Sequence, residues 1–120
     1  MDERRETGQR GEALVAAYLE RRGWRVICRN WRCATGEIDL VCCDPDGVMV
    51  VCEVKARSGG GYGSPLEAIT RAKVSKLRQL AAAWAKAYPE RIQALRVDAF
   101  GVLWRADGTA SVLHIRGIEP

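Results

Sequence analysis

Residues 36–55 read GEIDLVCCDPDGVMVVCEVK, and this stretch decides the fold. Two apolar, β-branched and cysteine-rich runs, Ile38–Cys43 and Val48–Ala56, are typical of strands. The DPDG segment between them has a proline suited to the first corner of a type I turn and a glycine able to adopt positive φ. The stretch therefore predicts a β-hairpin whose loop fixes the pairing of its two strands.

The register of this hairpin brings charged residues together. If the turn closes between residues 44 and 48, Asp39 lies opposite Glu53. Lys55 follows on the same face, opposite Glu37, which becomes a supporting charge. Directly opposed strand residues have Cβ atoms about 4.5–5.5 Å apart. Two carboxylates at that distance either share a proton or bind a cation.

A divalent cation suits this pair of carboxylates. Mg²⁺ takes hard oxygen ligands at about 2.0–2.1 Å and keeps waters that substrate oxygens can replace. We therefore interpret Asp39 and Glu53 as metal ligands and Lys55 as the residue that orients or deprotonates an attacking water. The alternative is a set of cross-strand ion pairs on a wet face of the sheet. A single ion pair of this kind is common, but four charged residues inside otherwise apolar strands are uncommon.

The segment before the hairpin predicts a helix. Apolar residues recur at helical spacing over Thr7–Arg22, and Gly23 ends the pattern. Gly8 and Gly11 fall on the inner side, where the missing side chains would let another backbone come close. Glu12 lies on the edge of the apolar stripe, so it is either a solvated surface glutamate or part of a site.

The rest of the chain predicts another strand, a second helix and a second hairpin. The strand is Trp24–Arg32, and the hairpin joins Leu95–Trp104 to Thr109–Ile115. The SPLE segment at residues 64–67 has the form of a capping box and predicts a helix that runs to about residue 87. The order αβββαββ gives an α/β fold with a mixed β-sheet flanked by helices.

The second helix carries a lysine in an unexpected place. Its inner stripe is expected to be Leu66, Ile69, Leu77, Leu80 and Trp84. The angular spacing places Lys73 in the middle of that stripe. A lysine there can bury its stem and extend its ammonium group to the rim. The neighbouring glycine-rich loop favours the alternative, contact with a phosphate or with a carboxylate of the site.

Length and composition fit a single globular domain over residues 1–120 and exclude a disordered protein, with 48% hydrophobic and 28% charged residues. The net charge of +4 is unevenly spread. Residues 36–53 hold five acidic and no basic residues, whereas residues 54–80 hold six basic residues and one acidic residue. An acidic centre between basic flanks suits a cation site surrounded by phosphate contacts. The alternative is mixed surface charge that serves solubility.

Location and thiol chemistry follow from what the sequence contains. No apolar run is long enough for a membrane-spanning helix, and charged residues follow Met1 where a signal peptide would be apolar, so we expect a cytoplasmic protein. The five cysteines lie in predicted strands without a C-x-x-C pair. We expect buried, reduced thiols rather than a metal or redox site, and structural roles for Asp98 and His114.

Several short motifs follow one another along residues 8–102. They are Gly8, Gly11-Glu12, Tyr18-Leu19, Asn30, the GEIDL and EVK segments, and the helix that carries Lys73. In these motifs the chain resembles the YraN family of uncharacterised bacterial proteins, which looks like a branch of the PD-(D/E)xK nucleases close to archaeal Holliday junction resolvases. The resemblance implies a restriction-endonuclease-like fold. The departure is Ile38, which stands where the proline of the motif would be.

The resemblance also implies roles for individual residues. Asp39 and Glu53 match the metal ligands and Lys55 matches the catalytic lysine. Glu12 matches a glutamate of the first helix that completes the metal site in resolvases. The implied cofactor is Mg²⁺ or Mn²⁺, and the implied assembly is a homodimer with two sites on one junction.

Basic residues around the predicted site are candidates for nucleic-acid contacts. They are Arg25, Arg29, Arg32, Arg57 and Lys73. Taken singly, the arginines do not differ from ordinary surface residues. Tyr62 in the glycine-rich loop could stack on an unpaired base. The four tryptophans are expected in the core rather than as stacking platforms.

The sequence therefore predicts a metal-dependent endonuclease that hydrolyses phosphodiester bonds. A domain of this size leaves little room for a sequence-reading module, so we expect recognition of the shape of branched or flapped DNA, in repair or recombination. DNA is favoured over RNA. The alternative is a nucleic-acid-binding or recruitment module of the same fold in which nuclease activity is weak or lost.

Overall fold

The computed structural model describes residues 3–58, 64–91 and 93–118. Its strands are β1 (Arg25–Cys33), β2 (Gly36–Cys43), β3 (Met49–Ser58), β4 (Leu95–Trp104) and β5 (Ala110–Ile115). Its helices are α1 (Glu3–Glu20) and α2 (Arg71–Ala87), with two short 3-10 helices, η1 (Pro65–Ala68) and η2 (Pro89–Arg91). The predicted α/β order αβββαββ is confirmed and is compatible with a restriction-endonuclease-like fold. No helix within the described ranges is long and apolar enough to cross a membrane.

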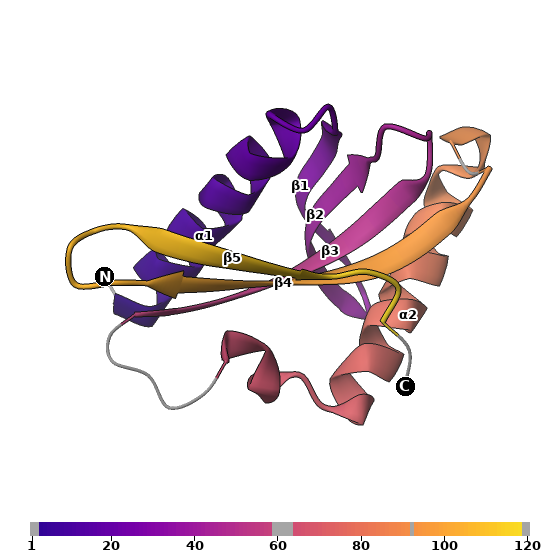
Figure 1. The fold of residues 1–120 in the computed structure, drawn as a ribbon. Coiled ribbons are helices and arrows are strands. Elements are labelled where there is room, and N and C mark those ends of the chain that lie inside the picture. The colour runs from indigo at the N-terminus through magenta and orange to yellow at the C-terminus, as the bar shows by residue number, and fades with distance from the viewer. Residues whose placement is uncertain (1–2, 59–63, 92, 119–120) are drawn as a thin grey trace.

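The five strands form one mixed sheet in the order β1-β2-β3-β4-β5. Neighbouring strands are antiparallel except β3 and β4, which are parallel. A parallel pair needs a crossover, and η1 with α2 supplies it. Figure 1 shows α1 on one side of the sheet and α2 on the other, so the sheet is covered on both faces.

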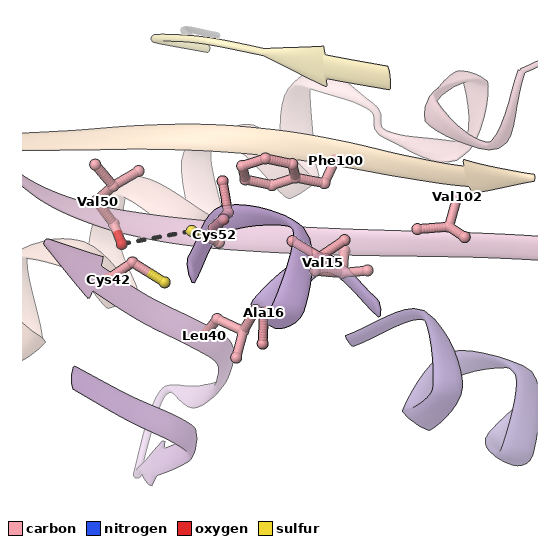
Figure 2. Packing of buried hydrophobic residues seen from close by; sticks show 10 residues of the cluster. Val15, Ala16, Leu40, Cys42, Val50, Cys52, Phe100 and Val102 are labelled. Atoms are coloured by element: carbon pink, nitrogen blue, oxygen red, sulfur yellow. Dashed lines mark hydrogen bonds between the residues drawn. The ribbon is translucent and has the colours of Figure 1, made fainter. Parts of the chain in front are cut away.

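The core beneath α1 depends on a close approach between the helix and β3. Val15 and Ala16 of α1 are fully buried against strand residues such as Val50 and Val102 (Figure 2). A Cβ atom on Gly11 would lie 2.7 Å from the Cβ of Ala56, so a larger residue would push the helix off the sheet. A close approach of another backbone was also predicted at Gly8. That prediction is wrong, because an added Cβ there would meet nothing within 4 Å.

The core beneath α2 is built from a stripe on that helix. Val74, Leu77, Leu80, Ala81 and Trp84 are buried there. They pack against residues of β2, β3 and β4, among them Ile38 and Val51. Trp84 is 1% exposed, which confirms its predicted place in the core, whereas the other three tryptophans are only partly buried.

The prediction of one helix from residue 64 to 87 is wrong. Ser64 does act as a cap, but it accepts a hydrogen bond from Leu66 N and begins only the short helix η1. Ile69 is extended, and Thr70 then caps α2 by accepting a hydrogen bond from Lys73 N at 3.2 Å. This break changes which side chains of α2 face the sheet. Lys73 is therefore exposed and does not lie in the buried stripe.

The hairpin of β2 and β3 has the predicted register. Its ladder runs from Leu40 opposite Cys52 to Cys43 opposite Met49. Asp44 N donates to the carbonyl of Val48 at 2.9 Å, which closes the turn between the predicted residues. Gly47 has φ +88°, a conformation that favours glycine.

The five cysteines are free thiols. Cys42, Cys43 and Cys52 are buried, and Cys28 and Cys33 are half-buried. Burial, together with the neighbouring thiol of Cys42, raises the pKa of Cys52 well above its ordinary value, so this thiol stays protonated. The expected burial is confirmed for the three cysteines of the core.

Asp98 anchors the end of the sheet remote from the β4–β5 turn. Its carboxylate is fully buried and accepts hydrogen bonds from Arg96 Nε (2.8 Å) and Gly117 N (2.9 Å), and it lies 2.8 Å from His114 Nε2. Arg96 also donates to Asp44 at the β2–β3 turn (3.2 Å). The network joins four segments of the chain, which supports the structural role expected for Asp98 and His114.

Replacing this buried acid should destabilise the fold. In Asp98→Asn the cationic Arg96 loses one of its two carboxylate partners and keeps only Asp44, so the free energy of unfolding should fall by about 3 kcal/mol at pH 7 in urea titrations. Asp46→Asn, at an exposed turn position, is the matched control and should change it by less than about 0.5 kcal/mol. Equal effects of the two changes would contradict the anchoring role.

The same network predicts a pH dependence. Burial alone would raise the pKa of Asp98, but hydrogen bonds from His114 and Arg96 outweigh it and lower the pKa from 3.8 to about 2. A carboxylate with a lowered pKa stabilises the fold above its unfolded pKa and loses that effect as pH falls. The stability difference between wild type and Asp98→Asn should therefore shrink between pH 4 and pH 2.

Candidate active site

The site lies where the sheet opens between β2 and β3. The ladder between these strands ends at Leu40 and Cys52. Beyond this point β2 stays paired with β1 and β3 stays paired with β4. The Asp39 carboxylate occupies the opening and accepts a hydrogen bond from Val54 N at 2.9 Å, in place of a strand carbonyl.

Three carboxyl groups meet in this opening, and we call them the carboxylate cluster: Glu12 of α1, Asp39 of β2 and Glu53 of β3. Asp39 lies close enough to both glutamates to raise the pKa of each. Val54 packs beneath α1 and Val51 packs beneath α2, so the alternation of β3 directs Glu53 to the α2 face, opposite Glu12. Glu12 is half-buried, so its side chain is not fully solvated.

The environment of the carboxylate cluster favours protonation. Burial, then the hydrogen bond and negative charge of Asp39, raises the pKa of Glu53 to about 8, although Lys55 and Lys73 act in the opposite direction. Burial and the charges of Asp39 and Glu37 raise the pKa of Glu12 to about 7. At neutral pH the cluster therefore retains protons and carries less negative charge than three free carboxylates would.

The chemistry of these donors fits Mg²⁺ or Mn²⁺. Carboxylate oxygens are the ligands that hard divalent cations prefer, and a cation would offset both the burial of these groups and the repulsion from Asp39. Within the described part of the chain, no three His, Cys, Asp or Glu side chains are already arranged as a complete metal-ligand set. Cation binding by these residues would therefore require their side chains to move closer together.

Glu37 does not face Lys55 as the extended register predicted. The strands have parted at this level, and Glu37 forms an ion pair with Arg32 of β1 instead (3.0 Å). With its amide oriented to satisfy both neighbours, Asn30 donates to Glu37 Oε1 (3.0 Å) and Glu12 Oε1 (3.1 Å). Glu37 thus supports the cluster through Asn30 rather than through Lys55.

Asn30 is a site residue that the sequence reasoning did not assign. It has φ +51°, which is unusual for a residue other than glycine, and among such residues asparagine adopts it most readily. An asparagine inside a predicted strand, beside a motif of acidic residues, was the available signal. Its contacts to α1 depend on the tertiary fold and could not be read from spacing.

Two pockets open on opposite sides of the carboxylate cluster. The pocket on the α2 side, which we call the lysine pocket, has a volume of about 450 Å³. It is lined by Gly36, Glu37, Glu53, Lys55, Ala72, Lys73, Lys76, Leu77 and Leu80. The pocket on the α1 side has a volume of about 640 Å³ and is lined by Gly8, Gln9, Glu12, Asn30, Arg32 and Glu37. Lys76 is a second residue that the sequence reasoning missed.

The other candidate contacts are spread over the molecule. Arg29 is exposed near Glu12, whose pKa its charge lowers, and Arg57 follows Lys55 on β3. Arg25 pairs with Cys43, four residues along β2 from Asp39, which corresponds to about 13 Å, so the fold does not bring it to the cluster. Tyr62 lies outside the described residues.

Comparison with known proteins supports the motif analysis. A profile for the uncharacterised protein family UPF0102 matches residues 11–102. A UPF0102 protein of Clavibacter michiganensis is 49% identical to this chain, over 97% of the chain and 98% of the relative. Relatives from Arthrobacter sp. (strain FB24) and Mycobacterium avium are 46% and 43% identical, each over 92% of this chain and over 93% and 88% of their own lengths.

The raised pKa of Glu53 predicts that this residue destabilises the metal-free fold. The pKa of Glu53 is about 8 in the folded chain and 4.5 when the group is free. Its ionisation therefore lowers the free energy of unfolding progressively as pH rises from 4.5 toward 8. In EDTA at pH 9, Glu53→Gln should therefore be more stable than wild type by on the order of 2 kcal/mol, and the gain should vanish near pH 4.5. Thermal unfolding at both pH values measures it.

The matched control is Glu90→Gln, which makes the same chemical change at an exposed position. Its unfolding temperature should follow that of wild type at both pH values. If Glu53→Gln is no more stable than wild type at pH 9, the carboxylate cluster does not carry the electrostatic strain assigned to it.

Proposed function

This chain belongs to the uncharacterised protein family UPF0102, the YraN family, and we propose that it is a metal-dependent nuclease of structured DNA. The observation that carries the proposal is the meeting of three carboxyl groups in the opening of the sheet, with a lysine beside them. A protein gains no stability from such an arrangement, because like charges in a partly buried place repel. A bound cation would offset this repulsion and would explain why the three groups lie together.

In this proposal each group has a defined task. Asp39, Glu53 and Glu12 would hold the cation, which would supply a positive charge to polarise the scissile phosphate and lower the pKa of a water. Val54 N–H fixes one oxygen of Asp39 at 2.9 Å and so limits how that carboxylate can turn. Lys55 lines the same pocket as Glu53, where its amine can orient the attacking water.

Charge around the cluster supports a nucleic-acid substrate. Lys55, Lys73 and Lys76 line the pocket on the α2 side, and Arg32 lines the pocket on the α1 side. These cations can contact phosphates on both sides of the cluster. Backbone contacts of this kind do not read sequence, so we propose selection of branched or flapped DNA by shape.

A second candidate function is binding without catalysis. It is favoured by one observation, that the described residues contain no complete metal-ligand set. In that case the basic surfaces would still bind DNA, and the protein would recruit other DNA-processing proteins. A panel of labelled duplex, flap, fork, four-way-junction and single-stranded substrates with Mn²⁺ or EDTA separates the two, because only the nuclease gives metal-dependent products.

Metal binding by the carboxylate cluster is the first test. Isothermal titration with Mn²⁺ should detect a site in wild type that the double change Asp39→Asn with Glu53→Gln removes, because both lost oxygens are anionic ligands. The pair Asp46→Asn with Glu90→Gln removes the same charge from exposed positions and should leave binding intact. Equal affinity in all three proteins would exclude the proposed site.

Lys55→Met separates catalysis from binding. The change keeps most of the aliphatic stem and deletes the ammonium, so the fold and most DNA affinity should survive. Single-turnover cleavage with Mg²⁺ should fall about 10²- to 10⁴-fold, as expected for loss of a positioned proton-transfer group. Lys86→Met, on the exposed last turn of α2, should cleave as wild type does. Near-normal cleavage by Lys55→Met would remove its catalytic role.

A further inference from the structure

We propose that the lysine pocket binds one unpaired nucleotide next to the scissile phosphate, so that the substrate class is DNA with a single-stranded branch. This inference rests on the proposed function and narrows it from structured DNA in general to flaps and single-stranded arms. It depends on three features of the pocket: its lining, its size and its position beside the carboxylate cluster.

The lining of the lysine pocket is divided into an apolar floor and a charged rim. Leu77 and Leu80 are 4% and 3% exposed and form the floor together with the exposed Ala72 of the same helix. Lys73 and Lys76 are exposed at the rim. A duplex backbone would use only the rim, because phosphates gain nothing from an apolar floor. A nucleotide uses both, with its base on the floor and its phosphate at the lysines.

The size of the pocket suits a single nucleotide. Its volume of about 450 Å³ lies within the range of about 300–1,000 Å³ found for small-molecule sites. Gly36 keeps this space open. A Cβ atom there would lie 3.4 Å from Cε of Lys76 and 3.8 Å from Cδ2 of Leu80, so any side chain would reach over the floor.

The position of the pocket connects it to the chemistry. Glu53 and Lys55 form its wall on the side of the carboxylate cluster. A nucleotide in the pocket would therefore place its phosphate beside the residues assigned to cleavage. Bases in a duplex are stacked and paired, and removing one costs a few kcal/mol, whereas an unpaired base enters without that cost. The pocket thus discriminates by pairing state rather than by sequence.

Filling the pocket without disturbing the fold tests the proposal. Ala72→Leu places a larger apolar side chain at an exposed helix position that lines the pocket. Ala82→Leu makes the same change at an exposed position of the same helix outside the pocket. Both residue types are good helix formers, so both variants should fold as wild type does.

The readout is binding in Ca²⁺ to two DNA probes, a duplex with a single-stranded flap and the same duplex without one. Wild type and Ala82→Leu should prefer the flap. Ala72→Leu should lose about tenfold in affinity for the flap and little for the duplex, since the base would lose its burial against the apolar floor. 2-Aminopurine at the first unpaired position should change its fluorescence with wild type but not with Ala72→Leu.

The outcomes separate this inference from the proposed function. Metal-dependent cleavage without a preference for the flap, or equal flap affinity in the two alanine variants, overturns the nucleotide site and leaves the nuclease standing. A flap preference that Ala72→Leu abolishes, in a protein that never cleaves, supports the nucleotide site and overturns the nuclease. Absence of binding to either probe by wild type overturns both.

Discussion

The hydrogen bond from Val54 N–H to the Asp39 carboxylate is the contact on which the site depends. Where β2 and β3 part, the backbone of β3 loses its strand partner, and an unpaired buried N–H would be costly. Asp39 satisfies that donor with a side chain instead of a carbonyl. The opening can therefore persist, and Glu12 and Glu53 each lie beside Asp39, one on either face of the sheet.

The carboxylate cluster and the buried Asp98 show opposite electrostatics, and the contrast separates structure from function. Asp98 is paired with Arg96 and His114, and its pKa falls to about 2. Burial and the neighbouring carboxylate of Asp39 raise the pKa of Glu53 to about 8. The first arrangement stabilises the folded chain. The second destabilises it in the absence of a cation, as expected of a site that acts on a ligand.

Sequence patterns predicted what depends on local geometry. The DPDG turn set the hairpin register, and that register correctly brought Asp39 beside Glu53. The second helix was predicted wrongly because two capping signals compete, Ser64 and Thr70, and only the later one begins α2. Because of that error, Lys73 was predicted in the buried apolar stripe of the helix, whereas it is exposed at the rim of the lysine pocket.

What the sequence could not give is mainly tertiary contact. Asn30 links α1 to β2, and Lys76 reaches the pocket only because α2 begins where it does. The Asp98 network joins residues more than 50 positions apart.

The roles of Asp39, Glu53, Glu12 and Lys55 in metal binding and catalysis stay predictions. The most direct measurement is anomalous diffraction at the manganese edge from crystals grown with Mn²⁺. The account predicts a peak within bonding distance of the carboxylates of Asp39 and Glu53, and a peak elsewhere or no peak would contradict it.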